Sequence, residues 1–481
     1  MSADMTQAWL SPARPMSIAH RGASAYALAN SLRAFQVAAD LGADMWEVDL
    51  HQTLDGVIVA FHDYTLADGR SITKLTHAEL RAALPDGEAP TFDEVIDLAL
   101  QTDTGIYADI KAWECARGVS DMLQAKGVER AILGAFDPRA VAELKAANTP
   151  YPRSVLVPVS VDPFEVIGDA EVIHPCWEHM ERPQDLLDAT FFARCEDLGK
   201  KVVLWHEEDP ARMAELRVKP ILGICSDRPE LVNPVTFKPD WQPKVICHRG
   251  ANKIAPENTL AAGHCAFAPG FSHFEIDVHI SADGELVVLH DPTVDRTTNG
   301  TGVTCEKTLA ELRALDAGSW FSPHFSDEKL PTLDEVLELA KLYDGNLYIE
   351  FKSAPAAPVW ERVVAYDLQD RCFFWSFVTE TLNDLRALTK GAHIMSRRQD
   401  FPTLKEASDA LKPSLVEYTI DDPWDDFTEL RASGMPVMIA YNGDDPAIFE
   451  RIIDARPDMV NIDQPFLFAR IAVDKGLAHR G

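Results

Sequence analysis

The sequence has no long hydrophobic run and no excess of basic residues. No stretch approaches about 18 uninterrupted apolar residues, and residues 1–16 lack the apolar core of an export signal, so we expect neither stable membrane insertion nor secretion. Lys and Arg number 45 against 76 Asp and Glu, a formal net charge of −31, which argues against nucleic-acid binding because polyanions attract clustered cations. We therefore expect a cytoplasmic protein that acts on a small molecule; the oligomeric state stays open.

The eight cysteines form no recognisable framework. They are scattered, with no C-x-x-C pair, a pattern typical of reduced thiols rather than of disulfides or a zinc site. Cys247, next to His248, invites interpretation as a nucleophile. Because it ends an apolar run, we interpret it instead as a small buried strand residue.

Several short motifs occur twice, which indicates an internal duplication. Three of them are separated by a constant 228 residues: His-Arg-Gly-Ala at 20–23 and 248–251, Glu-x-Asp at 47–49 and 275–277, and His-Asp at 62–63 and 290–291. Two later motifs are separated by 241 residues: Pro-Thr-x-Asp-Glu-Val at 90–95 and 331–336, and an acidic residue followed by x-Lys at 109–111 and 350–352. The second copy has therefore gained 13 residues between His290 and Pro331.

A length of 481 residues fits two domains of roughly 200 to 250 residues better than one core. Residues 232–243 contain three prolines and favour neither helix nor strand, so we place the domains at 14–234 and 243–475. Short β-rich runs alternate with helical patterns, which predicts parallel sheets. We predict two tandem (β/α)8, TIM-type barrels, with first-copy strands at 16–19, 45–50, 57–61, 106–110, 154–158 and 201–205 and helices at 30–41 and 92–100.

Acidic residues lie late in several predicted strands. Glu275 and Asp277 are two residues apart on one strand and so point to the same side, and Glu350 ends another strand. Because the carboxyl ends of barrel strands meet at one mouth, these carboxylates would repel one another unless a cation is bound. Oxygen ligands without cysteine favour Mg²⁺ or Ca²⁺. We predict one divalent cation per active barrel; the corresponding ligands in the first copy are Glu47, Asp49 and Asp109.

Histidines and basic residues occupy neighbouring strand ends. His248 and His290 could divide the roles of base and acid, because imidazole titrates near neutral pH. A single histidine at a strand end is more often structural, but here each occurs twice. Arg249 and Lys352 are predicted to bind an anion. The corresponding residues of the first copy are His20, His62, Arg21 and Lys111.

These motifs resemble the glycerophosphodiester phosphodiesterases, a family of phospholipase C-like phosphodiesterase barrels. The resemblance implies that His248 and His290 are the acid/base pair and that the three carboxylates bind the metal. It also implies hydrolysis of glycerophosphodiesters to glycerol 3-phosphate and an alcohol. The similar motifs are His248-Arg249-Gly250, Pro256-Glu257-Asn258-Thr259, Glu275-x-Asp277, His290-Asp291, Arg296-Thr297-Thr298 and Glu350-x-Lys352.

The first copy departs from this pattern. Residues 28–31, Leu-Ala-Asn-Ser, stand where the second copy has Pro-Glu-Asn-Thr, Asp109 replaces Glu350, and the Arg-Thr-Thr segment is missing. The first barrel could therefore hydrolyse a diester weakly, hydrolyse a different diester, or be a non-catalytic binding or structural module. A third hypothesis is lysophospholipase D-like activity, with Trp320 and Phe321 lining an acyl channel, although we interpret these two as a packing pair.

Two further pairs of polar residues have simpler interpretations. Asp227 and Asp463 are expected to fix a loop next to the last strand of each barrel. His51 and His279 follow the Glu-x-Asp motifs and could line the site or only make a strand face polar. The leaving alcohol, the metal and the attacking nucleophile, which is either a glycerol hydroxyl or water, are left open.

Overall fold

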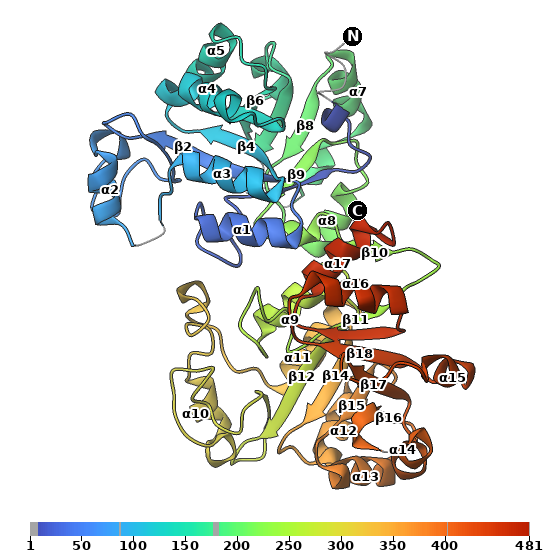
Figure 1. Ribbon diagram of the computed structural model, residues 1–481. Helices are drawn as coiled ribbons and strands as arrows, with labels where there is room; N and C mark the ends of the chain where they lie inside the picture. The colour runs from blue at the N-terminus through green and yellow to red at the C-terminus, as the bar shows by residue number, and fades with distance from the viewer. Residues whose placement is uncertain (1–7, 86–87, 177–181, 402, 481) are drawn as a thin grey trace. The chain divides into compact units, whose positions relative to one another are not determined.

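The structure is a computed structural model that describes residues 8–85, 88–176, 182–401 and 403–480. The chain divides into two compact units, the first ending at Pro234 and the second beginning at Val235 (Figure 1). Each unit contains one sheet of nine strands, eight of which are parallel and close into a barrel. The prediction of two tandem TIM-type barrels is confirmed.

In the first barrel, β9 pairs with β1 and β1 with β2, which closes the ring of parallel strands. The ninth strand, β3 (Ile58–Ala60), pairs antiparallel with β2. The predicted strand at 57–61 is therefore present, but it belongs to a hairpin outside the barrel. The barrel strands are β1 (Met16–Ala19), β2 (Met45–Gln52), β4 (Gly105–Ile110), β5 (Ala131–Ala135), β6 (Arg153–Pro158), β7 (Val172–Cys176), β8 (Lys201–Leu204) and β9 (Gly223–Ser226).

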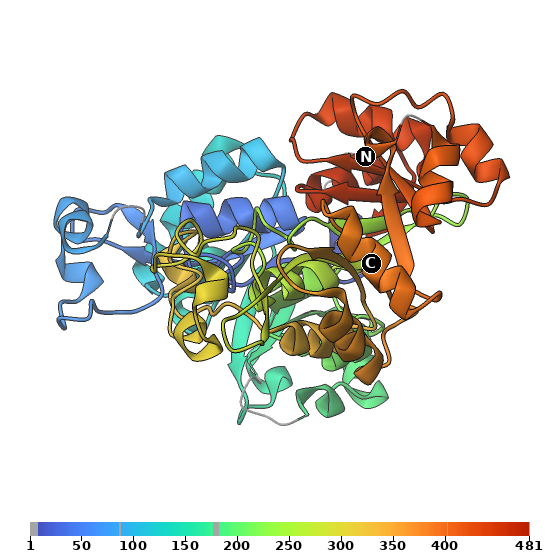
Figure 2. The ribbon, with the colours of Figure 1, turned by 90° about the horizontal axis from the view of Figure 1, so that it is seen from below.

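The helices of the first unit follow the predicted alternation. The repeated Pro-Thr-x-Asp-Glu motif starts one of them, because Thr91 caps α3 and the Glu94 side chain binds back to the Thr91 backbone N–H. After β3, the segment that contains α2 projects from its barrel in both views (Figures 1 and 2). The helices are α1 (Leu32–Leu41), α2 (His77–Ala83), α3 (Phe92–Thr102), α4 (Ala116–Lys126), α5 (Pro138–Ala146), α6 (Pro163–Val166), α7 (Ala189–Asp197) and α8 (Pro210–Leu216).

The second barrel repeats this topology, with β19 pairing to β11 and β11 to β12. β13 (Leu286–Val288) forms the antiparallel hairpin with β12. A separate two-stranded ribbon joins β10 (Val235–Phe237) to β20 (Ala478–Arg480). The barrel strands are β11 (Lys244–Cys247), β12 (His273–Ile280), β14 (Asn346–Phe351), β15 (Cys372–Trp375), β16 (His393–Arg397), β17 (Leu415–Thr419), β18 (Val437–Tyr441) and β19 (Met459–Ile462).

Thr332 and Glu335 repeat the capping box at the start of α11. Among the described residues, no helix has both the length and the apolar composition needed to cross a bilayer. The helices of the second unit are α9 (Leu260–Phe267), α10 (Leu309–Arg313), α11 (Leu333–Leu342), α12 (Ala356–Ala365), α13 (Thr379–Leu388), α14 (Leu404–Leu411), α15 (Phe427–Ala432), α16 (Pro446–Ala455) and α17 (Pro465–Asp474).

The core of the second unit lies where apolar strand residues pack against the surrounding helices. Phe274 and Ile349 are fully buried strand residues in one apolar cluster with Val336 of α11. Cys247 is fully buried at the end of β11, as its interpretation as a strand residue predicted. All eight cysteines are free thiols.

Candidate active sites

Three carboxylates meet at the mouth of the second barrel. Glu275 and Asp277 come from β12, and Glu350 of β14 is the direct neighbour of Asp277 across the ladder. One oxygen of each carboxylate lies within 4.8 Å of the other two, and all three residues are buried. Burial and the charge of Asp277 raise the pKa of both Glu275 and Glu350. A bound cation would relieve this repulsion, so the three oxygen donors fit a hard divalent ion.

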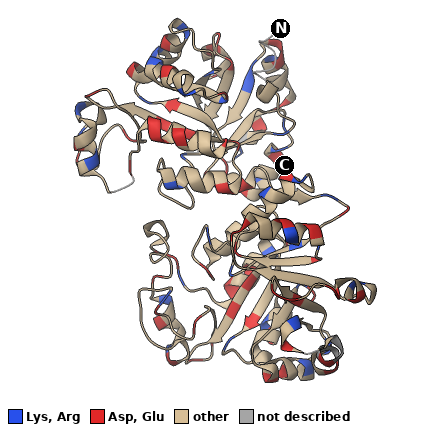
Figure 3. Cartoon of the chain, in the orientation of Figure 1, with Lys and Arg blue, Asp and Glu red and all other residues tan. Residues whose placement is uncertain are grey.

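Two basic side chains contact the carboxylates of the second barrel. The acidic positions on β12 and β14 can be seen in Figure 3. Lys352 Nζ lies 3.0 Å from Asp277 Oδ1 and also contacts Glu350. Arg249 Nε lies 3.7 Å from Asp277 Oδ2. Burial favours a raised pKa at Asp277, but Lys352, His290 and Arg249 outweigh it and hold that pKa below its usual value. The predicted anion-binding residues therefore lie directly beside the predicted metal ligands.

The His-Arg-Gly motif has a backbone explanation. Arg249 and Gly250 both have positive φ, 55° and 83°, and a Cβ on Gly250 would lie 2.7 Å from the Ala262 Cβ. Only glycine fits such a close approach at this φ. The resulting turn lets the Arg249 backbone N–H donate to Glu275 Oε2 over 2.7 Å.

Both histidines of the second barrel have a carboxylate at Nδ1. His248 Nδ1 lies 2.7 Å from Asp463 Oδ1, and its Nε2 lies 4.0 Å from Glu275 Oε2. His290 Nδ1 lies 2.7 Å from Asp291 Oδ1. In each case Nε2 is the nitrogen left for proton transfer. Sequence reasoning missed the contact of Asp463 with His248; the available signal was an aspartate directly after the last barrel strand in both copies.

The residues gained by the second copy place a positively charged side chain, Arg296, at the mouth of the second barrel. Arg296 donates to both Glu257 oxygens at 2.8 Å and to Asp291 Oδ2 at 2.7 Å. Asp291 is also the carboxylate at His290. In the first copy Ala29 stands in place of Glu257 and the segment that carries Arg296 is absent, so this ion-pair network belongs to the second barrel alone.

The first barrel gathers its carboxylates in the same way. Glu47 and Asp49 of β2 and Asp109 of β4 are buried, and their nearest oxygens lie within 4.8 Å of one another. Lys111 Nζ lies 2.9 Å from Asp49 Oδ1 and 2.5 Å from Asp109 Oδ2. Burial raises the pKa of Glu47 well above its usual value and that of Asp109 to about 6. The shorter side chain of Asp109 thus still reaches the cluster.

The histidines of the first barrel keep the same carboxylate partners. His20 Nδ1 lies 2.7 Å from Asp227 Oδ1, and His62 Nδ1 lies 2.7 Å from Asp63 Oδ1. Arg21 Nε lies 3.2 Å from Asp49 Oδ2. The positions named in the first copy are therefore brought together as in the second.

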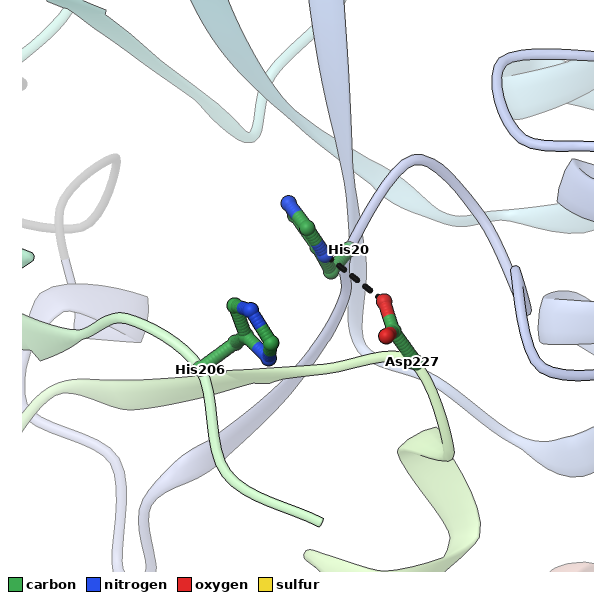
Figure 4. Close-up of side chains that lie close together, drawn as sticks. All are labelled: His20, His206 and Asp227. Carbon is green, nitrogen blue, oxygen red and sulfur yellow. Dashed lines mark hydrogen bonds and ion pairs between the residues drawn. The ribbon is translucent and has the colours of Figure 1, made fainter. Parts of the chain in front are cut away.

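A third imidazole, which sequence reasoning missed, lies beside His20. His206 follows β8 and stacks on His20 with ring centroids 4.7 Å apart and an interplanar angle of 15° (Figure 4). His20, His206 and Asp227 each offer a ligand atom within 4.8 Å. The nearly parallel rings, however, direct their nitrogen lone pairs along separate planes rather than toward one point. We interpret this group as a stacked imidazole pair and not as a metal centre.

His51 and His279 occupy equivalent positions in the two barrels. The Nε2 atoms of His51 and His279 lie 3.3 Å from the backbone oxygens of His62 and His290, respectively. They therefore contact the loops that carry those two histidines.

The sequence matches the Glycerophosphoryl diester phosphodiesterase family over residues 20–231 and 248–398, together more than half of the chain. The chain belongs to this family. The resemblance found in the second copy of the repeat is confirmed. The family match also covers the first copy.

Individual members of the glycerophosphoryl diester phosphodiesterase family match parts of the chain. The glycerophosphodiester phosphodiesterase of Caldanaerobacter subterraneus subsp. tengcongensis is 41% identical over 150 residues, which are 30% of this chain and 62% of that protein. That of Bacillus subtilis is 39% identical over 132 residues, 26% of this chain and 45% of that protein. The chain thus spans less than two thirds of the length of either relative. A crystal structure of the Agrobacterium tumefaciens glycerophosphodiester phosphodiesterase covers 48% of this chain and 100% of its own, at 35% identity and a TM-score of 0.46.

Proposed function

We propose that the second barrel hydrolyses glycerophosphodiesters to glycerol 3-phosphate and an alcohol in a metal-dependent reaction. The observation that carries this proposal is the convergence of three buried carboxylates, Glu275, Asp277 and Glu350, beside two carboxylate-paired histidines. Membership of the family supports the same reaction class.

Glu275, Asp277 and Glu350 would hold the divalent cation, Mg²⁺ or Ca²⁺. When bound there, such an ion polarises a phosphoryl oxygen and lowers the pKa of a hydroxyl. Arg249 and Lys352 lie against the same carboxylates and would bind the phosphate as fixed positive charges.

The two histidines would divide the proton transfers. Asp463 and Asp291 each occupy one Nδ1 atom, which orients the rings and leaves both Nε2 atoms for the substrate. One imidazole takes the proton of the attacking hydroxyl, and the other gives a proton to the leaving alkoxide.

The first barrel is a second candidate site of the same kind. Its carboxylates, its basic residues and its histidine–carboxylate contacts keep the arrangement of the second barrel. We propose that it binds its own cation and acts on a different diester, because it lacks the Arg296 network that flanks the second site. A non-catalytic module would have no need for three buried, repelling carboxylates.

The acidic composition of the chain supports a soluble diester as the substrate rather than a membrane surface. We also propose a cytoplasmic location. A lysophospholipid substrate stays an outcome of the experiment below.

The experiment measures the products released from glycerophosphocholine, glycerophosphoethanolamine and a lysophospholipid, with and without a chelator. We expect chelator-sensitive release of glycerol 3-phosphate from the soluble diesters. His290→Ala in a His20→Ala/His62→Ala background should abolish it. Undiminished hydrolysis by that triple variant, or turnover of the lysophospholipid alone, would overturn the proposal.

A further inference from the structure

A guanidinium and two aromatic rings lie beside the proposed active site. The Arg397 guanidinium carbon lies 4.3 Å from the centre of the Trp375 ring and 4.6 Å from that of Phe377. Lys352 Nζ lies 5.6 Å from the same Phe377 ring. We call Trp375, Phe377 and Arg397 the arginine ledge. Phe377 is the member of the arginine ledge that lies next to Lys352, and Lys352 in turn contacts the carboxylates of Asp277 and Glu350.

The arginine ledge leaves a hydrogen-bond donor and an apolar surface free. Asp400 accepts from Arg397 Nε and Nη2 at 3.0 and 2.7 Å. Within the described part of the chain, no partner is found for Arg397 Nη1. The Phe377 residue is 67% exposed. A ligand that extends past Lys352 would therefore meet an exposed ring and a charged donor.

Among the described residues of the first barrel, the arginine ledge has no counterpart. The β4–β5 and β14–β15 ladders pair Asp109 with Gly134 and Glu350 with Trp375. The residues before them, Leu133 and Phe374, pair with Arg153 and Ile394 in the next ladders, and Leu156 and Arg397 each lie three residues further on. Gly134 and Leu156 thus occupy the places of Trp375 and Arg397.

Both barrels have a lysine near an aromatic ring, whereas the arginine and the tryptophan occur at these positions in the second barrel only. Phe136, the counterpart of Phe377 in sequence, still lies near a lysine, with Lys111 Nζ 5.9 Å from its ring. The shared lysine and aromatic ring fit the part of the substrate that every glycerophosphodiester has. The arginine and tryptophan fit a part that varies between diesters.

We propose that the arginine ledge binds the leaving head group and favours a head group with an anionic oxygen, such as the carboxylate of glycerophosphoserine. This inference rests on the proposed phosphodiesterase function. The glycerol phosphate half would be held at the carboxylates and Arg249, so the head group extends over Lys352 and Phe377 toward Arg397. A guanidinium matches a carboxylate with charge-assisted hydrogen bonds.

A quaternary ammonium head group fits this surface less well. Aromatic faces alone attract such cations. Here both rings already carry the Arg397 guanidinium, and Phe377 also lies near Lys352. A choline group would therefore meet aromatic rings that already contact cationic side chains.

The test compares two substrates that differ by one carboxylate, glycerophosphoserine and glycerophosphoethanolamine. It uses the full chain with His20→Ala and His62→Ala, so that only the second barrel turns over. We expect Arg397→Leu to lower the ratio of the kcat/KM values, serine over ethanolamine, by about tenfold, the effect of losing one charge-assisted hydrogen bond. The loss should appear mainly in KM for the serine diester. Arg397→Lys, which keeps the charge but not the planar fork, should give an intermediate ratio.

Arg398→Leu is the matched control, because Arg398 contacts Asp426 and the Phe401 carbonyl instead of the arginine ledge, and it should keep the parent ratio. If both diesters are hydrolysed and Arg397→Leu leaves their ratio unchanged or raises it, the inference is wrong while the proposed function stands. If Arg397→Leu does not fold, judged by circular dichroism, the ratio for Arg397→Lys decides. If the parent hydrolyses neither diester, the proposed function itself fails.

Discussion

His248 and Asp463 are 215 residues apart in the sequence, yet their Nδ1 and Oδ1 atoms lie 2.7 Å apart. This contact fixes the orientation of the imidazole and directs its Nε2 toward Glu275, 4.0 Å away. His20 and Asp227 make the same contact in the first barrel. The carboxylate after the last strand of each barrel is therefore a positioning residue for the first histidine.

Replacing Asp463 with asparagine should lower kcat about 100-fold or more, because an amide can stabilise the wrong imidazole tautomer. KM should change little, since Asp463 does not contact the proposed phosphate site. Steady-state kinetics in the His20→Ala/His62→Ala background measures both constants. Asp474→Asn, at an exposed position of α17, is the control, and equal rates for the two variants would contradict the prediction.

The two carboxylate clusters predict two bound cations per chain. Glu275→Gln should remove one and Glu47→Gln the other, because each substitution removes a charged ligand from a three-carboxylate set. Isothermal titration of the purified chain with Mg²⁺ or Ca²⁺ gives the stoichiometry independently of turnover. One ion in the unmodified chain, lost only with Glu275→Gln, would mean that the first barrel does not bind metal.

Arg296 holds Glu257 and Asp291 together at the edge of the second mouth. Arg296→Ala should raise KM about tenfold and lower kcat less, because it frees the carboxylate that orients His290 and leaves two negative charges facing an anionic substrate. Kinetics at two ionic strengths measures the effect, which added salt should reduce. Arg313→Ala removes the ion pair with Glu335 and should leave KM unchanged; a matching rise there would show that the effect is not specific.

Gly250→Ala should destabilise the second unit by about 2–4 kcal/mol, the sum of left-handed strain and a close contact. A Cβ there meets Ala262 at 2.7 Å, whereas Gly284, also at positive φ, has no atom within 4 Å of its added Cβ. Gly284→Ala therefore isolates the strain and should cost only about 1 kcal/mol. Urea unfolding measures both free energies, and equal losses would contradict the packing argument.

His273, buried at the start of β12, should make the second unit sensitive to acid. Burial lowers its pKa to about 3, below the value of about 6.5 in an unfolded chain. The unfolded state therefore binds a proton first as the pH falls. The contribution of His273 to the free energy of unfolding is fully present above pH 6.5. It declines by about 1.4 kcal/mol per pH unit between pH 6.5 and pH 3.

His273→Gln should remove that part of the slope, measured as the free energy of unfolding at pH 4.5, 5.5 and 7. His479→Gln changes a residue that is exposed and serves as the control. An unchanged slope for His273→Gln would mean that another group carries the acid sensitivity.

The barrel architecture was predictable because short apolar runs mark most of the strands and the Pro-Thr-x-Asp-Glu motif begins a helix in each copy. Thr91 and Glu94 are recognisable as a capping box from their spacing alone. The run at 57–61 was recognised as a strand, but only the structure shows that it forms a hairpin with β2. Periodicity reports which side of a strand is buried and not which strand is its neighbour.

The clustering of Glu275, Asp277 and Glu350 could be predicted because strand ends of a barrel share one mouth. The contacts of His248 with Asp463 and of Arg397 with Trp375 could not, for two physical reasons. Asp463 follows a strand that is remote in sequence and adjacent only after the barrel closes. Arg397 belongs to no recognisable motif, and its proposed role depends on its contact with the Trp375 ring.

The ribbon of β10 and β20 joins the two ends of the second unit, with Val235 paired to Arg480 and Phe237 to Ala478. A fragment cut at 243 and 475 would lose both strands and expose the Phe468 face against which Phe237 lies. Anyone who wishes to express the second barrel alone should therefore keep residues 235–480, and should attach a purification handle through a spacer so that the final strand stays paired.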